Sequence, residues 1–124
     1  MTAGVLLDTH ALLWLIDGDS RVPGWLQEPA PATAIRISHA SLWEIAIKRS
    51  LGRLEVDDDL PDLLDGLGVN WLAISGEHVW GVRELPHHHG DPFDRLLIAQ
   101  ALAEGLVVAT ADPSFAQYGV PVRW

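Results

Sequence analysis

Four acidic residues stand where a folded chain could bring them together: Asp8, Glu44, Asp94 and Asp112. Asp8 directly follows the apolar run 5–7, and Asp112 follows the apolar run 106–109; both runs have the pattern of buried strands. Asp94 falls in the first turn of a helix predicted to open at Asp91. Glu44 has bulky apolar neighbours in sequence, where a carboxylate is unfavourable without a partner.

Carboxylates that converge on one sheet edge would repel one another and raise one another's pKa. A hard divalent cation removes that cost, and Mg²⁺ or Mn²⁺ prefers oxygen ligands. Such a cation can acidify a water molecule and neutralise a phosphodiester. The spacing of the acids is therefore compatible with a divalent-metal centre.

Each acid also has a structural explanation. Asp8 and Asp112 are placed as helix N-caps, for which aspartate is a favoured residue. Asp91 is followed by proline and, three residues after the cap, by an acid, which is a variant of the capping box. Glu44 stands four residues before Lys48, so the two can form an ion pair on a helix surface.

Strands and helices are predicted to alternate along the chain. We expect strands near 5–7, 34–38, 71–74, 106–109 and 120–122. We expect helices near 10–16, 21–28, 38–51, 57–67, 77–85 and 91–105, with a short helical turn at 112–117. This alternation predicts an α/β fold, a single-domain three-layer α/β/α sandwich with a central, mainly parallel sheet. Ligands of such sheets bind beyond the carboxyl ends of the strands.

The composition narrows the class of protein. The 124 residues, 48% hydrophobic and 20% charged, fit one globular domain spanning 1–124. The absence of cysteine excludes disulfides, thiolate zinc sites and cysteine nucleophiles. A net charge of −9 argues against a DNA-reading module but suits a site that holds cations. The apolar run 11–16 is too short to span a membrane and the N-terminus has no basic region, so we expect a cytoplasmic protein without a membrane partner.

Three segments of the sequence resemble the PIN domain, and more closely the VapC-type toxin ribonucleases of type II toxin–antitoxin systems. They are Val5-Leu-Leu-Asp-Thr-His-Ala-Leu-Leu-Trp14, Ser38-His-Ala-Ser-Leu-Trp-Glu-Ile-Ala-Ile-Lys48, and Asp91-Pro-Phe-Asp-Arg-Leu-Leu-Ile-Ala-Gln-Ala101 with Thr110-Ala-Asp112. The resemblance runs from about residue 5 to the end, while 57–89 matches by layout only. It implies a PIN-like fold and a Mg²⁺- or Mn²⁺-dependent endoribonuclease, a hydrolase of RNA phosphodiesters. It also implies a cognate antitoxin that neutralises the enzyme, and a homodimer.

The resemblance assigns catalytic and metal-binding roles to the same four acids, Asp8, Glu44, Asp94 and Asp112. The family mechanism uses metal-activated water, which leaves a 5′-phosphate and a 3′-hydroxyl. Thr110 matches a hydroxyl position near the metal. Asp91 fits the pattern but is better explained as an N-cap, and His10 as a packing residue or an outer neighbour of the site.

Three basic residues lie close together in sequence and are candidates for RNA binding. Lys48, Arg49 and Arg53 could steer phosphates toward an acidic cleft. A solvated helix face explains them equally well. The loop 87–89, three consecutive histidines, is expected to be exposed near the mouth of the cleft rather than to bind metal.

Two other functions remain open. Asp8 could be the nucleophile of a phosphatase or phosphotransferase, although that chemistry usually needs a second aspartate where His10 stands. The chain could also be a non-catalytic acidic module that binds a basic partner peptide. The second alternative explains the net charge but leaves Glu44 among apolar neighbours unexplained.

Overall fold

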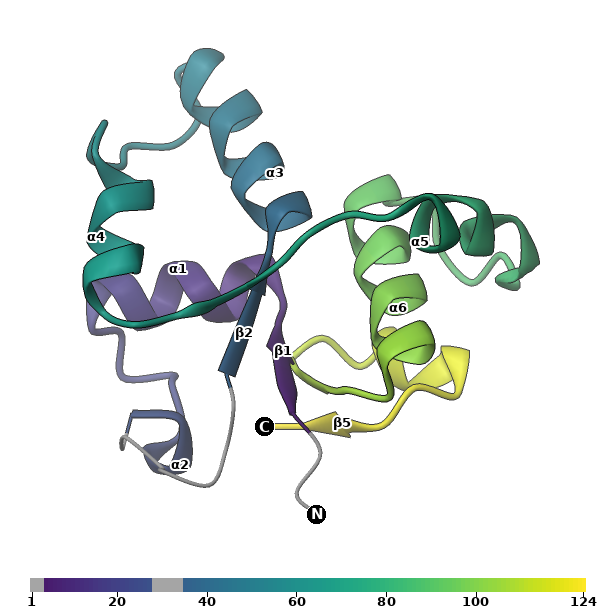
Figure 1. Ribbon diagram of the computed structural model, residues 1–124. Helices are drawn as coiled ribbons and strands as arrows, with labels where there is room; N and C mark the ends of the chain where they lie inside the picture. Colours follow the sequence, from purple (N-terminus) through teal and green to yellow (C-terminus); the bar gives the residue numbers. More distant parts are fainter. Residues whose placement is uncertain (1–3, 28–34) are drawn as a thin grey trace.

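Five parallel strands form the centre of the computed structural model, which describes residues 4–27 and 35–124 (Figure 1). The strands are β1 (Val5–Leu7), β2 (Ile35–Ser38), β3 (Asn70–Leu72), β4 (Val107–Ala109) and β5 (Val122–Arg123). Their order is β3-β2-β1-β4-β5, and each neighbouring pair is parallel. From β1 the chain adds β2 and β3 on one side of the sheet, and it then crosses to the other side of β1 to add β4 and β5. The strand order therefore reverses beside β1, and ligands of such folds bind at the carboxyl ends of the strands at this point.

Helices cover both faces of the sheet. They are α1 (Thr9–Asp17), α2 (Gly24–Gln27), α3 (His39–Ser50), α4 (Leu60–Gly66), α5 (Gly76–Gly81) and α6 (Pro92–Glu104), with 3₁₀ turns η1 (Val82–Glu84) and η2 (Phe115–Tyr118). In Figure 1, α1, α2 and α4 lie on one side of β1 and β2, and α5 and α6 on the other. The predicted three-layer α/β/α sandwich is confirmed.

The alternation of side chains along β1 divides the core in two. Leu6 packs into a cluster with α6 and η2, whereas Val5 and Leu7 pack into a second cluster with α1, α3 and α4. Strands buried on both faces read as continuous apolar runs, which is why 5–7 was recognisable in the sequence.

Several predicted boundaries shift. The helices expected at 21–28 and 57–67 begin three residues later, at Gly24 and Leu60, and the strand expected at 120–122 is Val122–Arg123. β3 ends at Leu72 because the chain then turns toward Ser75, which caps α5. The helix predicted over 77–85 is the short α5 followed by η1. The turn predicted over 112–117 begins later, at Phe115, since Asp112 Oδ1 accepts the Ser114 N–H in a preceding turn. Positions 28 and 34 of the predicted elements lie outside the described residues.

None of the helices within 4–27 and 35–124 combines the length and apolarity needed to cross a membrane.

Candidate active site

Asp8 and Thr110 meet at the carboxyl ends of adjacent parallel strands. Leu7 of β1 pairs with Ala109 of β4, so the next residue of each strand lies beside the other. Both side chains are buried, and Thr110 Oγ1 donates a hydrogen bond to Asp8 Oδ2. Asp8 Oδ1 accepts the Ala11 N–H at 2.7 Å, so Asp8 is also the N-cap of α1. The capping and site interpretations are therefore compatible.

Burial raises the pKa of Asp8 above its ordinary value. The hydrogen bonds from Thr110 and from the Ala11 N–H lower it, and the negative charge of Asp112 raises it slightly. Burial dominates because removing a carboxylate from water disfavours its charged form. Thr110 thus partly stabilises the ionised form that a metal ligand needs.

Hydroxyl contacts between elements hold α3 against the carboxyl edge. Ser38 is the N-cap of α3, and its Oγ accepts the Ala40 N–H at 2.9 Å. Thr9, at the start of α1, donates to Ser41 Oγ at 3.0 Å between two buried side chains. These bonds fix the first turns of α3 and therefore the position of Glu44.

Glu44 is buried, with 4% of its surface exposed. Its Oε2 accepts a hydrogen bond from Lys48 Nζ at 2.7 Å, which is the ion pair that the sequence suggested. Its Oε1 is buried and has no hydrogen-bond partner. An unpaired buried carboxylate oxygen is costly, and a cation beside it would remove that cost.

Asp94 lies in the first turn of α6 and its pKa is raised to about 6. Burial is the largest cause, followed by the negative charges of Asp91, Glu44 and Asp8. The negative charges of Asp8, after β1, and of Glu44, on α3, therefore act on Asp94 at the start of α6. Within the described residues, however, no three His, Asp or Glu side chains stand close enough to form a ready-made metal cage.

The donor set nevertheless suits a hard divalent cation. It offers the carboxylates of Asp8, Glu44 and Asp94, of which two have a raised pKa and the third an unpartnered oxygen. Repulsion holds such groups apart without a cation, and Mg²⁺ keeps several water ligands that can bridge the remaining gaps.

The other predicted site residues lie at the edge of this group of carboxylates. Asp91 is exposed, and its Oδ1 accepts the Asp94 N–H at 2.9 Å as the N-cap of α6. Asp112 is exposed, and its own N–H donates to Thr110 Oγ1 at 3.0 Å. Asp112 and His10 line a hollow of about 250 Å³ beside Asp8. His10 packs against Trp14 with the ring centroids 6.1 Å apart.

Of the three basic candidates, Lys48 contacts an acid of the site, because its Nζ forms an ion pair with Glu44. Arg49 instead pairs with Asp58 at 2.6 Å and donates to the Val56 carbonyl at 3.0 Å. Arg53 is exposed in the segment after α3. The three basic residues are close together in sequence, but in the structure Lys48 pairs with Glu44 whereas Arg49 pairs with Asp58.

The contact between His89 and Asp94 was not predicted from the sequence. His87 and His88 are exposed, as expected, but His89 is half-buried. Its Nδ1 lies 2.7 Å from the Tyr118 hydroxyl and its Nε2 lies 3.4 Å from Asp94 Oδ2. The one signal in the sequence was its position two residues before the N-cap of α6, which keeps it near Asp94.

Tyr118 fixes the orientation of the His89 ring. Its hydroxyl accepts the His89 N–H at 3.1 Å and a hydrogen bond from buried Arg95 at 3.3 Å. The hydroxyl also lies 3.4 Å from the His89 carbonyl, to which it donates, and 2.7 Å from His89 Nδ1. These contacts hold the ring so that Nε2 faces Asp94, and the hydrogen bond from His89 lowers the pKa of that carboxyl.

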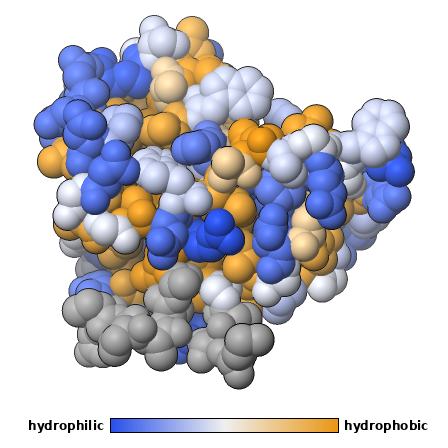
Figure 2. All heavy atoms as spheres, viewed as in Figure 1, coloured by the Kyte–Doolittle hydropathy of each residue, from blue (hydrophilic) through white to orange (hydrophobic). Residues whose placement is uncertain are grey.

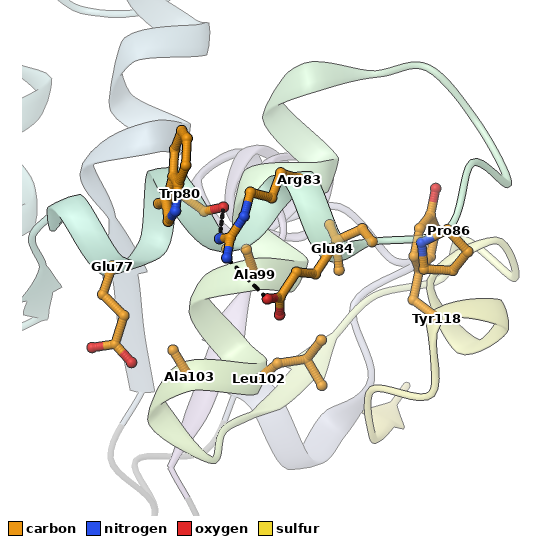
Figure 3. Close-up of a pocket in the computed structure, with 11 residues that line it drawn as sticks. Glu77, Trp80, Arg83, Glu84, Pro86, Ala99, Leu102, Ala103 and Tyr118 are labelled. Atoms are coloured by element: carbon orange, nitrogen blue, oxygen red, sulfur yellow. Dashed lines mark hydrogen bonds and ion pairs between the residues drawn. The ribbon is translucent and has the colours of Figure 1, made fainter.

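A larger hollow of about 570 Å³ lies away from these acids, between α5, η1 and α6 (Figure 3). Trp80, Glu84 and Leu102 are among its lining residues. Arg83 donates to the Trp80 carbonyl and pairs with Glu84 at its edge. None of the four predicted catalytic acids lines this hollow.

The comparison with protein families decides the classification. The model of the PIN domain family matches residues 5–121. This chain belongs to the PIN domain family. No curated protein sequence matches it.

Several solved structures share the fold of this PIN domain. A chain of VapBC2 from Rickettsia felis, bound to a promoter DNA fragment, superposes with a TM-score of 0.74 at 16% identity, covering 97% of each chain. A chain of DNA-bound VapBC from Salmonella typhimurium gives 0.72 at 18% identity and 98% coverage of both. A chain of a toxin–antitoxin complex from Klebsiella pneumoniae gives 0.67 at 20% identity, covering 97% of this chain and 96% of that one. At these identities the likeness is one of fold.

Proposed function

We propose that this PIN domain is a Mg²⁺- or Mn²⁺-dependent endoribonuclease, the toxin of a type II toxin–antitoxin system. The observation that carries the proposal is the buried, unpartnered Oε1 of Glu44, a residue whose negative charge, like that of Asp8, raises the pKa of Asp94. Neither a helix cap nor a peptide-binding surface explains a buried carboxylate oxygen without a partner. A divalent cation bound at this oxygen would explain it.

Asp8, Glu44 and Asp94 would hold the cation, with Asp112 at the open side of the site. The bound cation would make a water molecule more acidic and offset the negative charge of the RNA phosphate. Thr110 keeps Asp8 oriented and favours its ionised form. Lys48 neutralises part of the charge of Glu44.

A cognate antitoxin and a second copy of the chain are proposed as protein partners in the cytoplasm. The antitoxin is supported by the solved neighbours named above, which are VapBC or toxin–antitoxin complexes, whereas the second copy rests on the resemblance alone. The net charge of −9 also favours a partner that brings basic side chains to the acidic cleft.

Calorimetric titration with Mn²⁺ tests the metal site without any assumption about the substrate. We expect saturable binding by the wild-type chain and none by Asp8→Asn or Asp94→Asn. Glu55→Gln is the matched control, since Glu55 is an exposed acid in the connection between α3 and α4. Absence of binding by the folded wild-type chain would refute the metal site and favour the acidic interaction module.

Cleavage of RNA in Mn²⁺ then tests the reaction. We expect internal cleavage products with 5′-phosphates, lost in Asp8→Asn and retained in Glu55→Gln. Release of inorganic phosphate from a model phosphomonoester, without RNA cleavage, would instead indicate the phosphatase alternative.

A further inference from the structure

Two aromatic residues border the carboxylate site. Trp43 precedes Glu44 on α3, and Phe93 precedes Asp94 on α6. Their rings meet edge to face, with centroids 4.9 Å apart and planes at 75°. The same arrangement, an aromatic residue directly before a site acid, therefore occurs on both helices that flank the site.

Helix geometry places this aromatic pair at the rim. Successive side chains on a helix point about 100° apart, so a residue beside an inward-facing acid lies to its side. Glu44 is buried, whereas 54% of the surface of Trp43 is exposed. Figure 2 shows hydrophobic side chains at the surface where α3 lies beside the start of α6.

Packing of the core does not explain Trp43. Neither of the two apolar clusters includes it, although each includes other residues of α3. Its aromatic neighbour, Phe93, is half-buried and supports it from one side. The indole is thus held in place while more than half of its surface remains open to solvent.

The charges of the chain leave RNA with little electrostatic attraction. Phosphate contacts normally supply most of the affinity of a nucleic-acid binder, but the net charge is −9. Lys48 and Arg49, the basic residues on this helix, are paired with Glu44 and Asp58. Stacking of bases on aromatic rings is the other general source of affinity for single strands.

We propose that Trp43, supported by Phe93, is a stacking platform for one unpaired nucleobase beside the scissile phosphate. This inference rests on the proposed ribonuclease function and adds that the substrate is single-stranded at this position. A base in a duplex is already stacked on both faces and would have to leave the helix to reach the indole.

Four variants test the platform: Trp43→Ala, Trp43→Leu, Trp43→Phe and Trp80→Ala. Leucine keeps apolar volume without a π face, whereas phenylalanine keeps the π face. Trp80 is the matched control because it is 68% exposed and lines the hollow away from the acids. The readout is kcat/KM in Mn²⁺ for a random-sequence single-stranded RNA pool and for the same pool annealed to its complement.

We expect Trp43→Ala and Trp43→Leu to lower kcat/KM on single strands by about 5- to 150-fold, the range that corresponds to loss of one stacked base. Trp43→Phe should lose less than Trp43→Leu, and Trp80→Ala should behave as wild type. The preference for single strands over duplex should shrink with Trp43→Ala. If that variant fails to fold, the comparison of leucine with phenylalanine still decides.

Calorimetric Mn²⁺ titration of each variant separates the two proposals. Unchanged Mn²⁺ binding with reduced cleavage assigns the loss to RNA and supports the platform. Active wild type with equal activity in Trp43→Leu and Trp43→Phe overturns the platform alone. A changed oligomeric state of Trp43→Ala with unchanged cleavage overturns it in favour of an interface between copies. A wild-type chain that cleaves no RNA overturns both proposals.

Discussion

Replacing Asp94 by asparagine should stabilise the metal-free chain and abolish its affinity for Mn²⁺. The carboxyl of Asp94 has its pKa raised from 3.8 to about 6 by burial and by its acidic neighbours. At neutral pH the folded chain therefore keeps an ionised group in an unfavourable place. Asparagine has nearly the same shape without the charge, so it removes this cost.

The pH dependence gives the prediction its sign. Because the folded pKa lies above the unfolded value, the native state binds more protons than the unfolded state between about pH 4 and pH 6. The free energy of unfolding of the metal-free wild type should fall as pH rises through that window. The asparagine variant lacks this titration and should show less of the fall.

The magnitude follows from the shift. About two pKa units correspond to about 3 kcal/mol at most. The Asp94 side chain retains 21% of its exposure, and its charge at the start of α6 is favoured by the helix dipole, by about 0.3–1 kcal/mol. We therefore expect a net gain of about 1 kcal/mol near pH 7.5 and about a third of that near pH 4.5, where the carboxyl is protonated in the folded chain but already largely ionised in the unfolded chain.

Urea unfolding in EDTA at these two pH values measures the effect, with Glu55→Gln as the exposed-acid control. A gain of equal size at both pH values would show that asparagine acts through packing or hydrogen bonding rather than charge. A loss of stability near pH 7.5 would refute the reasoning, because the carboxylate would then be stabilising. With excess Mn²⁺ the order should reverse, since only the wild type gains binding free energy.

Three further variants test single contacts of the site. Thr110→Val removes the hydrogen bond to Asp8, so the pKa of Asp8 should rise and Mn²⁺ affinity should fall by about 10- to 100-fold in calorimetry. Unchanged affinity would contradict the orienting role of Thr110. Tyr118→Phe removes the acceptor of two hydrogen bonds, from His89 and Arg95, and should lower the free energy of unfolding by about 1–3 kcal/mol in urea. A neutral result would show that water replaces the hydroxyl. Lys48→Met removes the partner of Glu44 and should destabilise the metal-free chain more than the Mn²⁺-loaded chain; equal losses in thermal unfolding would place Glu44 outside the metal site.

Much of the fold could be read from local sequence. The buried strands are continuous apolar runs because helices cover both faces of the sheet. The starts of the helices were signalled by Asp8, Ser38 and Asp91, whose side chains accept backbone N–H groups as N-caps. Boundaries were less certain where a turn competed with a helix, as it does between Asp112 and Phe115.

The candidate site was only partly accessible to such reasoning. The acids were recognisable because Asp8 ends an apolar strand and Glu44 stands among apolar residues. It was not recognisable from the sequence that His89 is half-buried while His87 and His88 are exposed. His89 differs from them because it contacts Tyr118, which lies 29 residues further along the chain. The different partners of Lys48 and Arg49 were hidden for the same reason, since Asp58 reaches Arg49 only through the turn after α3.

The sequence alone therefore determined the element types, the parallel sheet and the acidic residues that we propose as cation ligands. Those properties depend on side-chain periodicity and on chemistry carried by each residue. Tertiary structure alone decided which oxygen of Glu44 stays unpartnered, how far burial raises the pKa of Asp94, and that Trp43 meets Phe93 at the rim. These properties arise between segments distant in sequence, where burial and charge depend on what the rest of the fold places nearby.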